Sequence, residues 1–171
     1  MSSFKSQKSN TKDIPELIET EKTVAENSRF AEILPFVKEG NSLFNRKKYI
    51  EAVSPYQKAY DRVPKASLLV KIAECYIEKG EEEKGLSILE NAVRTNKENA
   101  ISFKEGIYSF YYKKGELKRA EDGFYDILRE KPDSYYAYYM LGLVTMKRKN
   151  YEAAIGEFDT FYFSESKFCT K

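Results

Sequence analysis

The sequence repeats with a period close to 34 residues, and this period restricts the folds open to the chain. One small residue from each of four similar segments marks it: Ala52, Gly85, Ala120 and Ala154, which stand 33, 35 and 34 residues apart. Self-similarity at such a spacing is typical of proteins in which one supersecondary unit stacks on the next. We therefore expect a stack of similar units that share a continuous core.

Each segment combines small and bulky residues at fixed positions. Before the marker, a small residue is followed three positions later by a large one, as in Gly40 and Leu43. From the marker on, the order is small, bulky, small, as in Ala52, Tyr56 and Ala59. Antiparallel helices need small side chains where their backbones approach and bulky ones to fill the groove beside them. Each segment is therefore predicted to form a helical hairpin.

On these residues the chain resembles the tetratricopeptide repeat (TPR) family over roughly residues 33–167. Pro64 and Pro132 stand where that family ends its second helix, and proline stops a helix. The resemblance implies an all-α solenoid of four helical hairpins, with repeats at residues 30–64, 65–98, 99–132 and 133–171. The eight helices are expected at about 30–46, 48–62, 66–79, 82–96, 100–114, 117–131, 134–148 and 151–163, with Asp133 or Ser134 capping the seventh.

Four positions depart from the family pattern in the last two repeats. Tyr108 stands where a small residue is expected, and Thr145 is a weak substitute for a large one. Ile127 and Phe161 replace the last small residue of the second helix. The fourth repeat therefore keeps its register but fits the pattern less well.

The N-terminal segments lie outside the repeat. Residues 1–12 hold four Ser and three Lys, and this polar composition predicts a disordered tail. Asp13 followed by Pro15 resembles a helix start, with an acidic cap and proline in the first turn. Residues 13–29 are thus predicted to form an extra N-terminal helix, which could pack on the first repeat as a lid.

Composition and motifs argue against several classes of function. The chain has no histidine, so neither an imidazole base nor a histidine metal ligand is available. No phosphate-binding loop, nucleophile elbow or metal-ligand spacing appears, and we expect no enzyme activity, cofactor or metal. The net charge of +2 does not favour nucleic-acid binding. No apolar run suggests a membrane span and no secretory signal is recognisable, so a cytoplasmic location is expected.

The family resemblance also implies a binding surface, because the first helices of such repeats line a groove that holds partner peptides or helices. The residues carried over to this groove are Val37, Asn41, Phe44, Val70, Ile77, Tyr112, Tyr136, Tyr139, Leu143 and Met146, with Ser67, Glu74, Ser102, Glu105 and Ser109 among the polar positions between them. Exposed aromatic residues framed by polar groups are typical of protein-binding surfaces. The alternative is that several, especially Val37 and Val70, are partly buried between helices. The basic clamp by which some relatives hold a carboxylate is absent, because only Asn41 matches it and Lys71 alone of the other sites is basic.

The last helix lacks the polar outer face that usually closes a solenoid. Ile155, Tyr162 and Phe163 fall where a further helix would pack, so a partner, a second copy of the chain or the folded-back tail is expected to cover them. The sequence thus predicts an adaptor or scaffold that binds a protein or peptide. A small secretion or assembly chaperone is the alternative of the same class, whereas an enzyme or a nucleic-acid binder is disfavoured.

Overall fold

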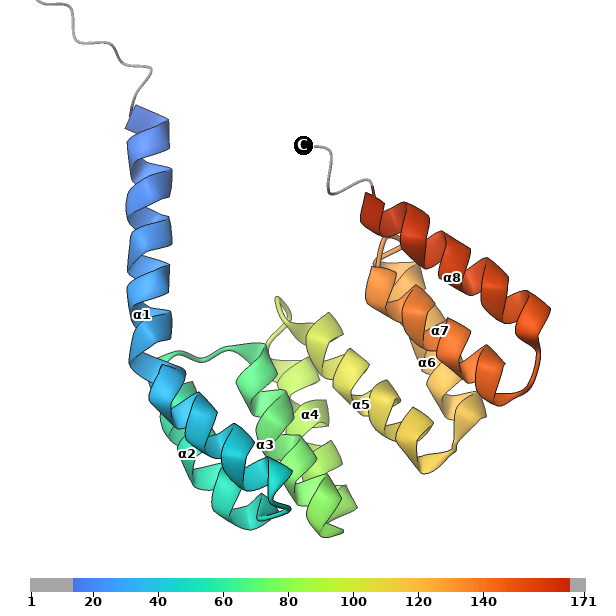
Figure 1. Cartoon of the computed structure of the whole chain (residues 1–171), viewed down its shortest axis with the longest axis horizontal. Helices are drawn as coiled ribbons and strands as arrows, with labels where there is room; N and C mark the ends of the chain where they lie inside the picture. Colours follow the sequence, from blue (N-terminus) through green and yellow to red (C-terminus); the bar gives the residue numbers. More distant parts are fainter. Residues whose placement is uncertain (1–13, 167–171) are drawn as a thin grey trace, which may run out of the picture.

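The computed structural model describes the backbone of residues 14–166 and the side chains of residues 28–160. The described chain consists of helices and turns without strands, and it forms four helical hairpins in sequence (Figure 1). The helices are α1 (Ile14–Asn45), α2 (Tyr49–Arg62), α3 (Ala66–Lys79), α4 (Glu82–Thr95), α5 (Ala100–Lys114), α6 (Leu117–Glu130), α7 (Tyr135–Lys147) and α8 (Tyr151–Ser166). The predicted all-α solenoid is confirmed, and α2 to α8 begin and end within three residues of the predicted bounds.

The first helix differs from the prediction. Residues 13–29 were expected to form a separate N-terminal helix or lid, but Ile14–Asn45 is one continuous helix of 32 residues. Neither glycine nor proline interrupts residues 16–34, so nothing in the sequence stops the helix before the first repeat. Figure 1 shows α1 bent partway along its length. Pro35 lies inside this helix, and an internal proline bends a helix by removing one backbone hydrogen bond. The tail predicted over residues 1–12 lies outside the described residues.

The turns within the four hairpins share one backbone conformation. Lys47, Gly80, Gly115 and Lys149 have φ values of 61°, 94°, 86° and 63°, and each lies two residues before the start of a second helix. This left-handed conformation is strain-free for glycine and unfavourable for other residues. The first and fourth repeats nevertheless use lysine there, so the hairpin geometry and not the glycine content determines the turn.

Small residues on the first helix accept bulky rings from the second, as the repeat pattern predicted. A Cβ atom added at Gly40 would lie 2.6 Å from Tyr56 Cε1, and one added at Gly142 would lie 2.5 Å from Phe158 Cε1. Real Cβ contacts are not this short, so only glycine allows these helix pairs to approach so closely. The Tyr56 hydroxyl also donates a hydrogen bond of 2.7 Å to Asn41 Oδ1, which joins α1 to α2.

The third hairpin reverses this arrangement. Tyr108, the residue that departs from the family pattern, lies on the first helix and packs its ring over Gly123 of the second. A Cβ atom added at Gly123 would lie 2.2 Å from Tyr108 Cδ1, and the Tyr108 ring meets Phe124 edge-on at 5.9 Å. Helix α5 therefore carries a large residue in addition to Phe124 on α6, and Gly123 on α6 provides the space for it.

The buried side chains fall into two clusters. The N-terminal cluster joins α1, α2 and α3 through residues such as Ile33, Tyr56 and Ile72. The C-terminal cluster extends from α3 to α7 and contains Phe103 and Phe124 among its largest fully buried side chains. Two half-buried residues, Leu69 of α3 and Ile88 of α4, pack against both clusters. The second hairpin therefore connects two partly separate cores.

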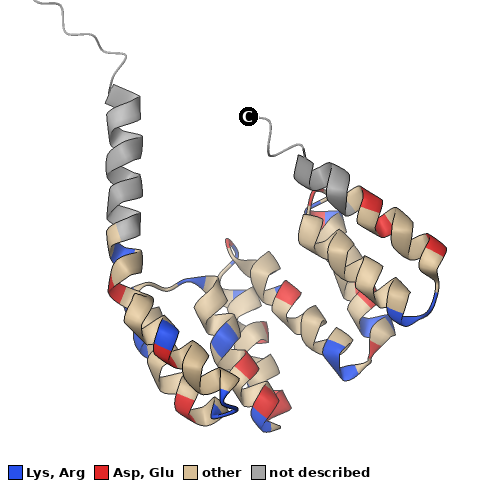
Figure 2. Ribbon diagram, viewed as in Figure 1, with Lys and Arg blue, Asp and Glu red and all other residues tan. Residues whose placement is uncertain are grey.

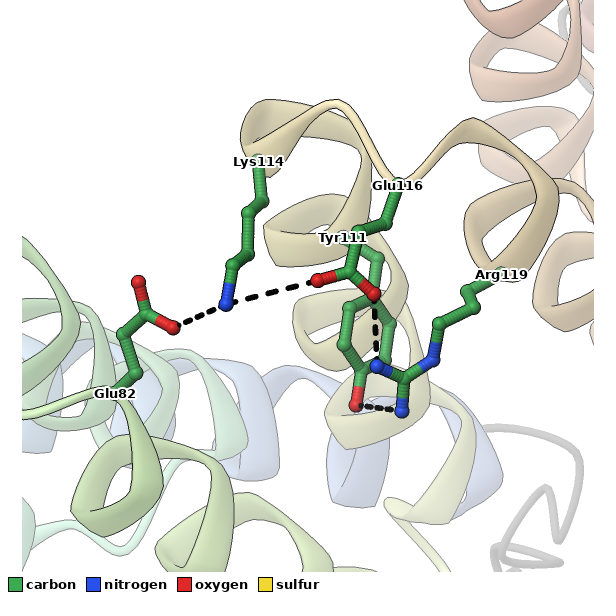
Figure 3. A network of polar contacts seen from close by, with 5 residues as sticks. All are labelled: Glu82, Tyr111, Lys114, Glu116 and Arg119. Atoms are coloured by element: carbon green, nitrogen blue, oxygen red, sulfur yellow. Dashed lines mark hydrogen bonds and ion pairs between the residues drawn. The ribbon is translucent and has the colours of Figure 1, made fainter.

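Ion pairs connect neighbouring hairpins along the edge where the paired helices turn. Figure 2 shows basic residues at these turns. Lys114 donates to Glu82 of the preceding hairpin at 2.5 Å, and Arg148 donates to Glu121 at 2.6 Å. Figure 3 shows that the Lys114 contact continues through Glu116 to Arg119, which also donates to the Tyr111 hydroxyl at 2.8 Å. Because these ion pairs are exposed to water, which screens their charges, the network links neighbouring hairpins but adds little to the stability of the fold.

Candidate partner-binding groove

The first helices of consecutive hairpins lie side by side on one face of the stack. Helix α5 contacts α3 and α7 directly, in addition to its own hairpin partner and α4. Two hollows open on this face, one between α3, α5 and α7 with a volume of about 300 Å³ and one beside it with a volume of about 360 Å³. Ser102, Glu105 and Tyr136 line both hollows. The two hollows therefore form one groove across the middle of the chain, which we call the α3–α5–α7 groove.

Several residues that the family resemblance assigned to a groove line these hollows. They are Ser67, Val70, Glu74, Ser102, Glu105, Ser109 and Tyr136. Lys71 and Gly106 complete the first hollow. Val70 is half-buried, as the alternative interpretation expected, but it still forms part of the lining. A Cβ atom at Gly106 would lie 3.3 Å from both Val70 Cγ1 and Leu89 Cδ1, so the floor of the groove is tightly packed.

Three other predicted groove residues have contacts within their own hairpin. Ile77 is half-buried and packs against Gly85, whose added Cβ atom would lie 2.6 Å from Ile77 Cγ1. Phe44 meets Tyr49 of α2 edge-on at 5.2 Å. Asn41 is exposed but accepts the Tyr56 hydrogen bond. Ile77 and Phe44 therefore contribute to helix packing, as does the half-buried Val37, which packs on the N-terminal cluster.

The remaining predicted residues lie beyond the hollows, toward the ends of α5 and α7. Tyr112 carries Lys147 over its ring at 4.6 Å, and Leu143 is half-buried against the C-terminal cluster. Tyr139 and Met146 are exposed, and the Tyr139 ring lies 6.1 Å from that of Phe158 on α8. These residues form an aromatic and apolar surface that continues from the groove toward α8.

Tyr136 of α7 is held in place by one contact with α5 and one with α6. Ser134 caps α7 by accepting a hydrogen bond of 3.3 Å from the Ala137 N–H, which sets where the helix begins. The Tyr136 hydroxyl lies 2.9 Å from Ser109 Oγ, and its ring meets Phe124 edge-on at 6.3 Å. Burial raises the pKa of Tyr136, which therefore stays protonated at neutral pH. The Ser109 contact was not predicted, because it depends on how two hairpins stack.

Some charged side chains of the groove form ion pairs with one another, and one does not. Lys71 donates to Glu74 at 2.7 Å, and Lys113 lies 3.7 Å from Glu74 and 3.9 Å from Glu78. Glu105, in contrast, has no ion pair within 4.0 Å among the described residues. Burial raises the pKa of Glu105, and attraction to Lys131 and a hydrogen bond from Ser134 oppose this effect. This environment of Glu105 could not be predicted from the repeat pattern, because Lys131 and Ser134 lie in a turn outside the repeat positions.

Two large apolar side chains are exposed on α8, beside the exposed acidic residues Glu152 and Asp159. Tyr151 and Ile155 expose 60% and 61% of their surface. Tyr162 and Phe163, the other residues predicted for this surface, lie outside the described side chains. Within residues 14–166, helix α8 contacts α7 and no following element covers it.

Hairpins of this length, stacked with their first helices lining a hollowed face, make the described chain a helical-repeat solenoid. No protein-family model matches the sequence, and no curated protein matches it. Known structures do match in fold. The crystal structure of MamA has 16% sequence identity and a TM-score of 0.55, over 88% of this chain and 87% of MamA.

Two further structures give the same result. YrrB, described as a TPR protein with an unusual peptide-binding site, matches over 90% of this chain and 81% of its own, with 19% identity and a TM-score of 0.51. PilF of Pseudomonas aeruginosa matches over 80% of this chain and 63% of its own, with 17% identity and a TM-score of 0.55. The TPR-type fold is thus confirmed. None of the described helices combines the length and apolar character that crossing a membrane requires.

Proposed function

We propose that the chain is an adaptor or scaffold that holds an extended segment of a partner protein in the α3–α5–α7 groove. The observation that carries this proposal is the pair of adjoining hollows that share Ser102, Glu105 and Tyr136. Side chains of an extended segment alternate in direction, so two hollows in a row suit successive inward-facing residues of one strand. The peptide-binding site described for YrrB supports a comparable role for this fold. A cytoplasmic location stays a prediction.

Blocking the groove should remove partner binding without unfolding the chain. Ser102 is exposed and lines both hollows, so Ser102→Arg would fill the groove while leaving the buried core unchanged. The double variant Tyr136→Ala with Tyr139→Ala would remove its aromatic surface. We expect each to lower the affinity for groove-bound partners roughly tenfold or more, as loss of a central interface contact does.

The measurement is quantitative recovery of partners from a lysate of the native cell, followed by titration of the recovered partner. A matched control removes two exposed large side chains elsewhere, as Tyr125→Ala with Ile50→Ala, on α6 and α2. Circular dichroism melting confirms that all variants are folded. Equal recovery of every partner by wild type, Ser102→Arg and the groove double variant would reject the groove as the binding site.

A second candidate surface is α8, and we propose that a second copy of the chain covers it. The exposed Tyr151 and Ile155 favour this, because side chains of this size are usually covered at the end of a solenoid. We expect wild type to show the mass of a dimer at micromolar concentration in size-exclusion chromatography with light scattering, and Ile155→Lys to show that of a monomer. Ile50→Lys on α2, which is 45% exposed, is the matched control. A wild type that stays monomeric would exclude this dimer.

A further inference from the structure

Glu105 occupies the central position of the α3–α5–α7 groove. It lies on the second turn of α5 and lines both hollows, so any segment that crosses the groove passes its carboxylate. The side chain is half-buried, and it receives one hydrogen bond, from Ser134. A carboxylate has two oxygens with about four acceptor positions, so most of its capacity to accept hydrogen bonds is unused by the described residues.

The other charges of the groove do not neutralise this carboxylate. The two hollows are lined by three carboxylates, Glu74, Glu98 and Glu105, and by two lysines, Lys71 and Lys131. Lys71 is held by Glu74 at 2.7 Å, and Lys113 at the rim of the groove is shared between Glu74 and Glu78. Lys131 attracts Glu105 but lies beyond 4.0 Å and is itself exposed. The centre of the groove therefore carries an excess negative charge.

We propose that the α3–α5–α7 groove selects partner segments with a lysine or arginine side chain, which pairs with Glu105. This inference rests on the proposed groove function and names the chemistry of the segment that the groove holds. An ammonium or guanidinium group supplies the donors that Glu105 lacks, and its charge offsets the desolvation of the carboxylate. An acidic side chain at the same place would face the unpaired carboxylate of Glu105, and it would be rejected.

Position distinguishes Glu105 from the other acidic residues. Glu74 is already bound by Lys71, so a ligand would have to displace that pair. Glu98 lines one hollow only and is exposed, so water screens its charge. Glu83 is exposed on α4 and lies outside both hollows. Two controls therefore remove the same charge elsewhere. Glu98→Gln removes it beside the proposed contact, and Glu83→Gln removes it away from the groove.

The test is selection of random-sequence peptides displayed on phage by the full chain at neutral pH and physiological ionic strength. Wild type should enrich peptides with Lys or Arg at one fixed position. Glu105→Gln should lose this preference, and its affinity for a selected synthetic peptide should fall roughly tenfold, as expected for loss of a hydrogen bond to a charged group. Glu98→Gln and Glu83→Gln should keep the preference and change the affinity much less.

The outcomes separate this inference from the groove function itself. Selected peptides that need the groove but show no basic residue, or that bind Glu105→Gln equally well, would overturn the Glu105 contact and leave the groove function standing. If the affinity fell equally for all three Gln variants, the preference for basic peptides would come from the general charge of the chain. This outcome would also overturn the Glu105 contact. If wild type selects no peptide that Ser102→Arg fails to bind, both the groove function and the Glu105 contact are rejected.

Weaker peptide binding by the Glu105→Gln variant could not be attributed to unfolding of that variant. The pKa of Glu105 is raised in the folded chain, so the ionised carboxylate makes the fold less stable at neutral pH, and this cost disappears as the pH falls below the folded pKa. Glutamine is neutral at every pH and keeps an oxygen that accepts the Ser134 hydrogen bond. Glu105→Gln should therefore melt at the same temperature as wild type or higher at neutral pH, and this difference should shrink toward pH 4.5.

Discussion

Replacing Phe124 with alanine is expected to lower the free energy of unfolding by about 3–5 kcal/mol, the usual cost of truncating a fully buried phenylalanine. Phe124 has no exposed surface, and its ring meets Tyr108 on α5 and Tyr136 on α7 edge-on. The cavity would open where α5, α6 and α7 meet, so neighbouring side chains could fill it only by moving two hairpins. Urea denaturation followed by circular dichroism measures the change.

The neighbouring residue supplies the control for this prediction. Tyr125 is 43% exposed, and its hydroxyl makes one long hydrogen bond of 3.4 Å to Glu157. Tyr125→Ala should therefore cost less than about 1 kcal/mol. If the two alanine variants unfolded at the same urea concentration, the burial of Phe124 and the position of α6 described above would be wrong. Because Phe124 also supports Tyr136, the Phe124→Ala variant should bind groove partners more weakly even where it remains folded.

The second large effect concerns the reversed packing of the third hairpin. Gly123→Ala should destabilise the chain by about 1–3 kcal/mol, the range for inserting a methyl group into a packed site. Helix propensity alone would give the opposite sign, because alanine stabilises a helix interior by roughly 0.5–1 kcal/mol relative to glycine. The added Cβ atom would lie 2.2 Å from Cδ1 and 2.4 Å from Cγ of Tyr108. Both atoms lie near the base of the ring, so a small rotation of the side chain does not relieve the clash.

A double-mutant cycle tests whether Tyr108 is the cause. In a Tyr108→Ala background the ring is gone, and Gly123→Ala should be neutral or stabilising. The two substitutions should thus be coupled by more than about 1 kcal/mol, measured as the difference between the effects of Gly123→Ala in the two backgrounds. Gly156→Ala on α8 is the matched control, since nothing lies within 4 Å of its added Cβ atom. Independent effects at positions 108 and 123 would contradict the packing.

The parts of the fold that follow from local pattern could be predicted from the sequence. Small and bulky residues repeat at the helix crossings, and Pro64 and Pro132 follow the last residues of their helices. The prediction of a separate helix over residues 13–29 was wrong, because no glycine or proline in residues 16–34 ends the helix before the first repeat. Tyr108 departs from the family pattern, and Gly123 was the residue in the sequence that could have indicated where the Tyr108 ring packs. The two were not linked, because they are far apart in sequence.

The groove was predictable in outline only. The family resemblance implied that Val70, Glu105 and Tyr136 share one face, because repeat register determines which side of a helix a residue occupies. Register does not determine what each side chain touches, and so Ile77 was placed in the groove although it packs against Gly85. The pairing of Lys71 with Glu74 and the isolation of Glu105 depend on rotamers and on the stacking of three hairpins. Such properties are not encoded in any single repeat.

The division of the core has a consequence for how folding and binding are connected. Helix α3 contributes Leu68, Ile72 and Cys75 to the N-terminal cluster, while its opposite side supplies Val70 and Glu74 to the groove. If the first hairpin opens locally, α3 loses the support behind one wall of the binding site. Repeat proteins open in such units because contacts are mostly between neighbours. A bound segment would therefore protect the amides of α2 from hydrogen exchange without touching them, and destabilising substitutions in α2 would weaken affinity from a distance.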